Sequence, residues 1–421
     1  MSQPRPGLPA KQIAAVVAGN ALEFYDFLTY AFFATQIAHA FYPDYSPARG
    51  LLLTLATFGA GFLTRPLGAW IIGGMGDRLG RKPAMILSFA LMGVALFGLA
   101  LTPSYRSIGI AAPIIALGFR MLQGFALGGN VGPTTAYLIE AAPEGRRGFY
   151  ASLSFASQDF SVMVAGIVGT ALSYLLSPVH FNEYGWRIAF LLGASIVPFG
   201  LMLRRTLTET HDPAVDRDAP PLPLLPYLPV ALFGLVLLAS ATISNYVLDY
   251  MTTYANDTLH MNTKAAFGAT IVLGLFQVSA DLVSGWLSDR YGRKRVMIIP
   301  TALMLLLALP AFFVIAYFRT AAALFAATAV LAALQGLGSS PILIWITESI
   351  PARIRSGAVS VIYAVSIAIF GGTTQATVKF LLDWTHNPLM PAWYASAALA
   401  AGLIAMVLIR ESAPPRARTA Q

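Results

Sequence analysis

Three cations lie inside long apolar stretches of the sequence: Arg65, Arg120 and Lys379. Holding a charge at the centre of a bilayer costs about 2.5–3.5 kcal/mol on insertion scales, so such a residue is a candidate functional residue by default. An arginine stays charged and can grip a carboxylate with two parallel hydrogen bonds. Arg120 and Lys379 are therefore candidate ligands of an organic anion.

Each cation also has a structural interpretation. Arg120 can form an ion pair within a helix bundle. Lys379 lies nearer the end of its apolar stretch, so its ammonium group can instead extend to the membrane surface. It follows Gln375 by four positions, and the two residues therefore share a helical face. For Arg65, which precedes a proline, we expect a structural pair with an acid.

The same stretches contain five acidic residues that are candidates to bind and release protons: Glu23, Asp26, Asp159, Asp249 and Asp281. Glu23 and Asp26 are three positions apart, so they share one helical face. Neighbouring carboxylates repel and burial disfavours their charged forms, so one of them can bind and release a proton near neutral pH. We expect Asp26, and then Glu23, to carry a coupled proton, although either can be structural. Asp159 and Asp249 are candidates for a second proton carrier or a water-mediated substrate contact.

Uncharged polar residues complete a candidate substrate site. In a bilayer such side chains face the interior of the helix bundle, where many only join helices. The candidates for substrate contacts are Gln123, Asn130, Gln158, Asn245, Tyr246, Thr374 and Gln375, and a wider set of cavity residues adds Asn20, Tyr30, Gln36, Tyr250 and Thr373.

The sequence argues against an enzyme, a metal site and a cofactor. It contains no cysteine, and its five histidines fall in loops or near the ends of apolar stretches. The phosphate-binding pattern Gly-x-x-x-x-Gly-Lys-Ser/Thr does not occur, which disfavours ATP-driven activity. The patterns Gly-x-Ser-x-Gly and His-Glu-x-x-His are also missing from the sequence.

The elements that must position these residues are membrane-spanning helices. Hydrophobic residues make up 57% of the chain and charged residues only 11%, against about 25% in soluble domains. The apolar stretches are each near the ~20 residues that cross a bilayer. The sequence predicts spans at 13–40, 50–75, 83–102, 109–139, 149–176, 187–206, 227–254, 265–288, 296–317, 321–346, 357–382 and 391–410.

The two halves of the chain repeat each other. Gly-x-x-x-Asp-Arg-x-Gly-Arg-Lys occurs from Gly73 and again from Gly285, 212 positions later, and Gln123-Gly124 returns as Gln335-Gly336 at the same offset. Such a repeat indicates an internal duplication. Between the halves lies a segment rich in charge and proline, which is typical of a solvated linker. We therefore expect a six-helix bundle in 1–206, a linker in 207–226 and a second six-helix bundle in 227–421.

The cations predict the orientation in the membrane. If the N-terminus is cytoplasmic, 19 of the 27 lysines and arginines fall in cytoplasmic segments, five on the opposite side and three within spans. The excess of cytoplasmic cations favours both termini inside. It also accounts for the net charge of +8 without a nucleic-acid partner.

The repeated loop motif and the two sets of six spans resemble the major facilitator superfamily. A narrower resemblance is to its metabolite–proton symporter branch, carried by 19–27, 65–68, Arg120 with Gln123-Gly124, 371–375 and 387–394. The last two segments look most like citrate and tricarballylate carriers. Members of the branch usually have a glutamate where this chain has Asn130, so a proton role at that position does not carry over. The neutral amide resembles a permanently protonated acid.

The resemblance implies that the repeated loops form a cytoplasmic latch, which closes the two halves in the outward-facing state. Glycines permit tight turns, an aspartate can accept from helix N-termini, and arginines can pair with acids. The latch residues are then Asp77, Arg78, Arg81, Asp289, Arg290 and Arg293, and Glu140, Glu348, Arg147, Arg355 and Asp281 are candidates for the same network. The alternative is an ordinary positively charged loop.

The resemblance also implies a function. We expect an all-α membrane protein whose two pseudo-symmetric bundles alternate access to a central site and import an organic anion with protons. Citrate or a related di- or tricarboxylate is the expected substrate, and we expect a monomer in the bacterial inner membrane. Two alternatives remain: a symporter of zwitterionic osmolytes such as proline or betaine, which has less need of Lys379, and a sensor that binds without transport, which Asn130 favours.

Overall fold

The computed structural model describes residues 10–79, 81–128, 134, 138, 142, 143, 145–195, 198, 199, 202 and 225–412; of these, the side chains at 73, 74, 76–79, 81, 82, 85, 225 and 352–357 are not described. Regular structure in these ranges is entirely helical. The first half contains α1 Ala10–Phe32, α2 Ala34–Phe41, α3 Pro47–Leu63, α4 Arg65–Leu79, α5 Arg81–Leu101, α6 Tyr105–Ile108, α7 Ala111–Gly128, α9 Arg147–Leu175, α10 Pro178–His180, η1 Phe181–Gly185 and α11 Trp186–Gly193. The second contains η2 Leu225–Tyr227, α13 Leu228–Asp249, α14 Met251–Thr253, η3 Tyr254–Thr258, α15 Thr263–Tyr291, α16 Arg293–Phe318, α17 Ala321–Ser349, α18 Ala352–Ser366, η4 Ile367–Gly371, α19 Gly372–Thr385 and α20 Met390–Leu408.

Nine helices in the described residues are long and apolar enough to cross a membrane. They include every span expected in the second half, together with Pro47–Ile72, Ala111–Gly128 and Arg147–Leu175. The expected span 83–102 contains a shorter apolar helix, Ile86–Leu101. The expected span 13–40 is divided into α1 and α2 at Phe33, and 187–206 is described only in part.

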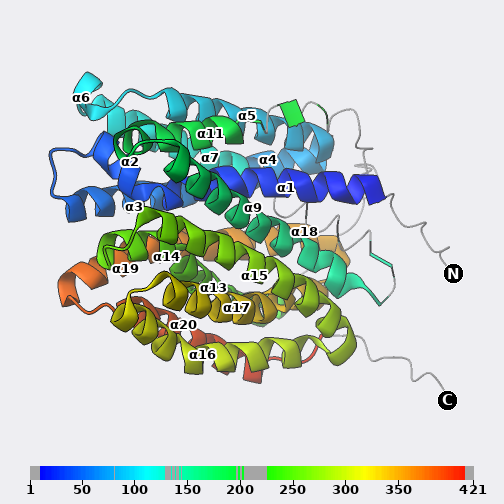
Figure 1. Cartoon of the computed structure of the whole chain (residues 1–421). Helices are drawn as coiled ribbons and strands as arrows, with labels where there is room; N and C mark the ends of the chain where they lie inside the picture. The colour runs from blue at the N-terminus through cyan, green and yellow to red at the C-terminus, as the bar shows by residue number, and fades with distance from the viewer. Residues whose placement is uncertain are drawn as a thin grey trace, which may run out of the picture.

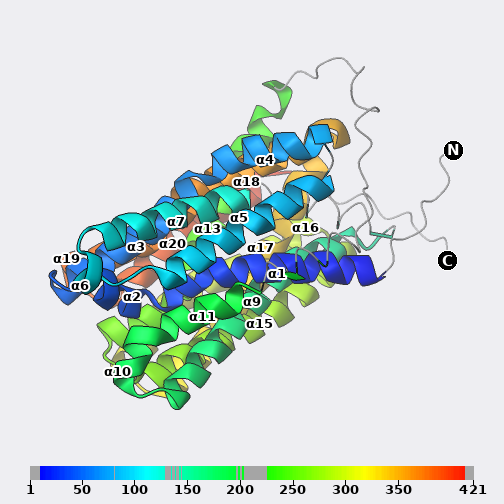
Figure 2. The same cartoon turned by 90° about the horizontal axis from the view of Figure 1, so that it is seen from above.

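The helices gather into two groups along the chain. Figure 1 shows the helices of the first half, blue to green, above most of those of the second half, and both views show the long helices running nearly along one direction. The start of α1 and the end of α20 lie at the same end of the molecule (Figures 1 and 2). We call this the latch end, and the end that carries α2, α6 and α10 the far end.

Glycines let the two halves approach closely along α9 and α15. A Cβ on Gly166 of α9 would lie 2.7 Å from the Ile271 nitrogen, and one on Gly285 of α15 would lie 2.8 Å from the Gly148 carbonyl oxygen. Real Cβ atoms avoid both distances, so only glycine permits this separation of the helix backbones. A second contact between the halves joins α3 to α19, where Gly59 lies against the backbone of Gly372.

Within the first half, glycines also bring α7 against α3 and α4. A Cβ on Gly124 would collide with the carbonyl group of Gly61 on α3, and one on Gly128 with that of Arg65 on α4. Gly124 belongs to the repeated Gln-Gly pair. Its role is therefore close packing that places Arg120, one turn earlier, against α3 and α1.

In the second half, polar side chains cap the N-termini of two helices, and a glycine forms the turn between two others. Asn262 Oδ1 accepts from Lys264 N at the start of α15, and Thr320 Oγ1 accepts from Ala323 N at the start of α17. Between α15 and α16, Gly292 has a φ of 92°, a backbone conformation that glycine adopts without strain. This glycine belongs to the repeated loop motif, where it makes the turn between two long helices.

The packing of α7 yields a test. Gly124→Ala should destabilise the protein by about 1–3 kcal/mol, because the added methyl group must displace the backbone of α3. Gly118→Ala, on the same helix, is the matched control, since a Cβ there meets nothing within 4 Å. Thermal unfolding of the purified variants in detergent measures the difference. Equal melting temperatures for the two variants would contradict the close packing of α7 on α3.

Candidate functional site

Arg120 lies on α7 of the first half and is completely buried. Its guanidinium carbon is 4.4 Å from the ring centre of Phe27, 4.5 Å from that of Tyr30 and 5.0 Å from that of Phe58. Its Nη1 donates to Gln123 Oε1 at 2.6 Å, while Nε and Nη2 have no hydrogen-bond partner. The aromatic faces stabilise the cation, and one edge of the guanidinium group remains available.

Arg65 lies against the same aromatic group. Its guanidinium carbon is 4.4 Å from the ring centre of Phe27 and 4.3 Å from that of Phe62. Its Nε and Nη2 also lack a hydrogen-bond partner, although the residue is 2% exposed. The acid that interacts electrostatically with Arg65 is Glu23. Among the described side chains, Arg65 forms no direct ion pair.

These groups form one unit, which we call the arginine–aromatic cluster: Arg65, Arg120, Phe27, Tyr30, Phe58 and Phe62. Tyr246 of α13 closes it from the second half, with ring centres 5.6 Å from Phe62 and 6.2 Å from Phe58. Its phenol interacts electrostatically with both arginines. The cluster therefore lies where the two halves meet.

The two acids of α1 lie beside the cluster, and Glu23 interacts electrostatically with its Arg65. Glu23 and Asp26 are both completely buried and interact with each other electrostatically. Ser88 Oγ donates to Glu23 Oε1 at 3.4 Å. Asp26 lies against Gly193 of α11, and neither of its carboxyl oxygens has a hydrogen-bond partner. Among the described side chains, Asp26 forms no ion pair with an arginine.

Helix α13 contributes a chain of polar side chains from the second half. Asn245 Nδ2 donates to Asp249 Oδ2 at 3.2 Å, and Gln277 Nε2 of α15 donates to Asn245 Oδ1 at 2.6 Å. Asp249 Oδ1 is buried without a partner. On α9, Gln158 is half-buried and its neighbour Asp159 is buried. The structure thus brings Asn245 and Asp249 together.

Helix α19 holds the remaining candidates. Lys379 Nζ lies 2.8 Å from Asp257 Oδ2 and 2.9 Å from Asp383 Oδ1, so its charge is neutralised within the protein. Thr374 Oγ1 donates to the Phe370 carbonyl. Gln375 is buried, and neither atom of its amide has a partner. Of these residues, Gln375 has the most free hydrogen-bonding capacity.

The second copy of the loop motif makes a closed contact at the latch end. Asp289 accepts from the backbone nitrogens of Gly148 at 2.8 Å and Phe149 at 3.0 Å, at the N-terminus of α9. An anion is favoured there by the helix dipole. Arg293 then pairs with Asp289 at 2.9 Å and with Glu348 at 2.9 Å. This network joins α9 of the first half to α15, α16 and α17 of the second.

Other expected latch residues lie elsewhere or are not described. The guanidinium carbon of Arg290 is 5.6 Å from the ring centre of Trp286 and 5.7 Å from that of Tyr291. Asp281 is bonded to Ser340 and lies deeper in the bundle. The side chains of Asp77, Arg78, Arg81 and Arg355 lie outside the described residues, as do Asn130 and Glu140.

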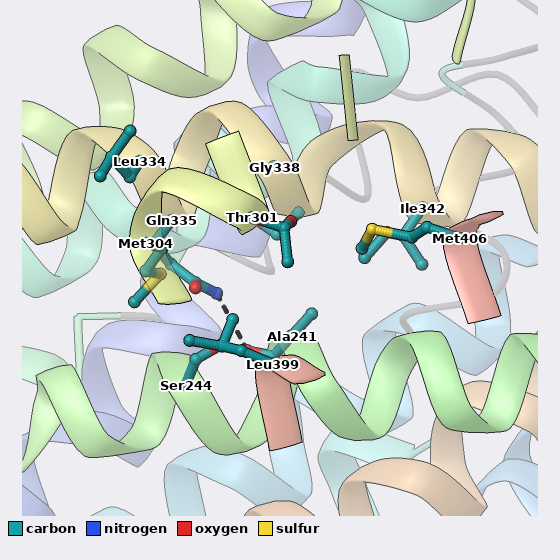
Figure 3. Close-up of a pocket in the computed structure, with 11 residues that line it drawn as sticks. Ala241, Ser244, Thr301, Met304, Leu334, Gln335, Gly338, Ile342, Leu399 and Met406 are labelled. Carbon is teal, nitrogen blue, oxygen red and sulfur yellow. Dashed lines mark hydrogen bonds between the residues drawn. The ribbon is translucent and has the colours of Figure 1, made fainter. Parts of the chain in front are cut away.

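A small pocket occupies the second half, away from the arginines. It lies between α13, α16, α17 and α20 (Figure 3) and is lined by Ala241, Ser244, Thr301, Met304, Leu334, Gln335, Gly338, Ser339, Ile342, Leu399 and Met406. Gln335 Nε2 donates there to the Ala241 carbonyl at 2.9 Å. The lining holds no charged residue, so this pocket does not fit an organic anion.

Some groups at the site were not anticipated from the sequence. Phe58 and Phe62 are four positions apart on α3, and their stacking on the arginines depends on helix packing that no local pattern reveals. Gln277 is different, because it is a polar residue inside the predicted span 265–288. The rule that selected Gln123 would also have selected Gln277.

Comparisons with known proteins agree with this architecture. The family model described as Major Facilitator Superfamily matches residues 16–282, and the one described as Sugar (and other) transporter matches residues 225–414. The xylose transporter XylE from Escherichia coli, in a partially occluded inward-open conformation, superimposes with a TM-score of 0.78 at 17% identity, covering 95% of this chain and 98% of that one.

Curated relatives extend over nearly the whole chain. The citrate-proton symporter of Klebsiella pneumoniae is 36% identical over 408 residues, which are 95% of this chain and 92% of the relative. The alpha-ketoglutarate permease of Escherichia coli is 32% identical, covering 95% and 93%. The proline/betaine transporter of the same organism is 30% identical, covering 96% and 84%.

These matches confirm the expected fold of twelve transmembrane helices in two six-helix bundles. The relatives and structural neighbours are transporters and not enzymes. This chain is therefore a multi-pass membrane transporter that belongs to the major facilitator superfamily.

Proposed function

We propose that this protein is a proton-coupled symporter that imports an organic anion with two or three carboxylates, such as citrate. The observation that carries the proposal is the pair of buried guanidinium groups that both lie against the ring of Phe27, each with Nε and Nη2 unpartnered. These two nitrogens form the edge of a guanidinium group that binds a carboxylate through two parallel hydrogen bonds. Two such edges suit a substrate with at least two carboxylates.

Other groups around the cluster complete the proposed site. Gln123 orients Arg120 through its 2.6 Å hydrogen bond. Tyr246 and Gln375 present polar atoms from the second half, and Asn130, Gln158, Asn245 and Thr374 remain candidate ligands. Lys379 holds η3 to α19 through Asp257 in this closed arrangement. We assign it a substrate contact only in a state in which that ion pair opens.

The proposed proton carrier is Asp26. Burying a carboxylate without a hydrogen-bond partner costs much more free energy than burying the neutral acid. Glu23 interacts with it electrostatically and is the second group proposed to carry the proton. Asp159 and Asp249 are the proposed second pair of carriers on the opposite side of the site. The relatives named for citrate and alpha-ketoglutarate support an anionic substrate.

We further propose how the molecule sits in the cell. The latch end faces the cytoplasm of a bacterium and the protein is a monomer in the inner membrane, with both termini inside. The segments 1–206 and 227–421 move as two rigid bundles connected by 207–226, and they alternate access to the site. The excess of cations in the segments at the latch end supports this orientation.

A zwitterionic osmolyte is the second candidate substrate, because relatives at 30% identity are named proline/betaine transporters. Aromatic rings can bind a quaternary ammonium group. In this protein, however, two arginines occupy positions over the rings of Phe27, Tyr30, Phe58 and Phe62. That charge favours an anion over a betaine.

The function itself is tested by citrate uptake into proteoliposomes, with and without an inward proton gradient. We expect accumulation above the external concentration only with the gradient. The Asn130→Glu variant is measured in the same assay as the parent protein. If only the variant accumulates citrate, position 130 carries the coupling and this chain is an uncoupled form. No uptake by either protein excludes citrate, and binding without counterflow identifies a sensor.

Arg120→Ala should lower citrate affinity at least about tenfold, since a hydrogen bond to a charged group contributes about 1.5–3 kcal/mol. Arg65→Gln should weaken citrate binding but leave a monocarboxylate such as acetate unaffected, because it removes only one of the two carboxylate contacts. Titration calorimetry on purified protein measures both. The exposed Arg106→Lys variant is the control. Wild-type affinity in Arg120→Ala would remove this residue from the site.

Asp26→Asn should spare citrate counterflow and abolish accumulation driven by the proton gradient, because the amide cannot carry a proton. The exposed Asp44→Asn variant should behave like the parent protein. Both activities are measured in the same proteoliposomes. Continued accumulation in Asp26→Asn would place the coupling acid elsewhere.

A further inference from the structure

Three ionised side chains meet where α19 runs toward the far end of the molecule (Figures 1 and 2). Lys379 Nζ lies 2.8 Å from Asp257 Oδ2 of η3 and 2.9 Å from Asp383 Oδ1, one turn further along α19. We call these three residues the lysine triad. With two carboxylates on one ammonium group, the triad is negatively charged as a whole, and its cation is already neutralised.

The members of the lysine triad are unequally buried. The side chain of Lys379 is 5% exposed, whereas those of Asp257 and Asp383 are 18% and 38% exposed. When the ion pairs open, water therefore reaches the two carboxylates more readily than the ammonium group. A buried cation without a partner is costly, so Lys379 needs another anion in place of its aspartates.

Other contacts hold η3 near the end of α19 without any charge. Tyr254 Oη of η3 donates to the Pro388 carbonyl, beyond the end of α19, at 2.8 Å. The ring of Tyr254 also packs on Phe312 of α16, with ring centres 5.5 Å apart. Because these contacts join the same segments, the ion pairs of Lys379 can open while η3 stays in place.

One face of α19 connects the lysine triad to the arginine–aromatic cluster. A Cβ on Gly372, the first residue of α19, would lie 3.2 Å from the Phe62 Cβ, so this turn of the helix contacts the cluster. Gln375 and Lys379 follow Gly372 by three and seven positions, which places them on the same face. Seven residues of α-helix are about 10 Å long.

A lysine released from its aspartates can extend back along this face. Long side chains of a helix lean toward its N-terminus, over the preceding turn, and lysine has a flexible four-carbon stem. For Lys379 that direction leads to Gln375 and the cluster, whereas Asp383 holds its ammonium group over the following turn. The amide of Gln375 is buried with both atoms unpartnered, so its oxygen is available to accept from the ammonium group.

We propose that Asp257 and Asp383 take the place of a substrate carboxylate on Lys379, and that a tricarboxylate displaces them. Two carboxylates of the substrate then bind the two arginines, and the third binds the ammonium group after it has turned back along α19. The aspartates lower the affinity for the substrate by competing with it. Lys379 thereby distinguishes anions with three carboxylates from anions with two. This role rests on the proposed function, which supplies the anion at the arginines.

Two matched anions measure this selectivity: citrate has three carboxylates, and 3-hydroxyglutarate is the same molecule without the central one. Titration calorimetry on the purified parent and on the double variant Asp257→Asn/Asp383→Asn gives the affinity for each. We expect the double variant to bind citrate at least about tenfold more tightly, because the freed lysine contributes a hydrogen bond between charged groups. Its affinity for 3-hydroxyglutarate should equal that of the parent.

Further variants separate this effect from others. In the Lys379→Gln background, the two aspartate substitutions should leave the citrate affinity unchanged, since no ammonium group is freed. Asp44→Asn/Glu183→Gln removes the same amount of negative charge from exposed positions at the far end and should match the parent. The single variants Asp257→Asn and Asp383→Asn should each give part of the gain, and they replace the double variant if it does not fold.

Three results would overturn the proposal: a citrate affinity that does not rise when the aspartates are neutralised, an equal rise for both anions, or a rise that persists with Lys379→Gln. Ion pairs that are only structural give the first result together with a lower melting temperature. If the parent binds citrate and no substitution alters the selectivity, the competing role of the aspartates is excluded and the symporter stands. If neither anion binds to any of these proteins, the anion site at the arginines and its lysine subsite are both excluded.

Discussion

The placement of two positive charges in an apolar interior is the constraint on which this structure depends. Arg65 and Arg120 are buried, and each keeps one edge of its guanidinium group without a hydrogen-bond partner. The faces of aromatic rings from α1 and α3 stabilise these cations without neutralising them. The close approach of α7 to α3 at Gly124 is what brings the rings and the guanidinium groups together.

The two halves meet on both sides of this cluster. At the latch end, Asp289 satisfies the backbone at the start of α9 and is itself held by Arg293. At the far end, the ring centre of Phe267 is 4.9 Å from that of Phe33, and Lys264 Nζ lies 3.9 Å from the ring centre of Tyr174. Contacts between the two halves therefore exist at both ends of the molecule. To open toward either face of the membrane, the two halves must break the contacts at the latch end or those at the far end.

The internal duplication repeats the helical scaffold in both halves, but equivalent positions do not make the same polar interactions. Gln123 and Gln335 are equivalent positions, but the first orients Arg120 and the second bonds to the Ala241 carbonyl beside an uncharged pocket. The position equivalent to Arg120 is Ala332. If the fold itself required a cation at this position, both halves of the chain would have one. The asymmetry supports the proposal that Arg120 binds the ligand, while the glycines common to both halves belong to the packing.

The sequence by itself determined the class of protein, the helical spans and most of the residues that carry charge into the membrane, because burying an ion is so costly that few positions qualify. Residues such as Arg120, Asp26 and Asp249 are recognisable for that reason. Only the tertiary structure decided which of them meet. Lys379 is paired with Asp257, and Asp289 accepts from the Gly148 nitrogen across the two halves, 141 positions away. Such partners depend on how helices distant in sequence pack, and no local periodicity encodes that.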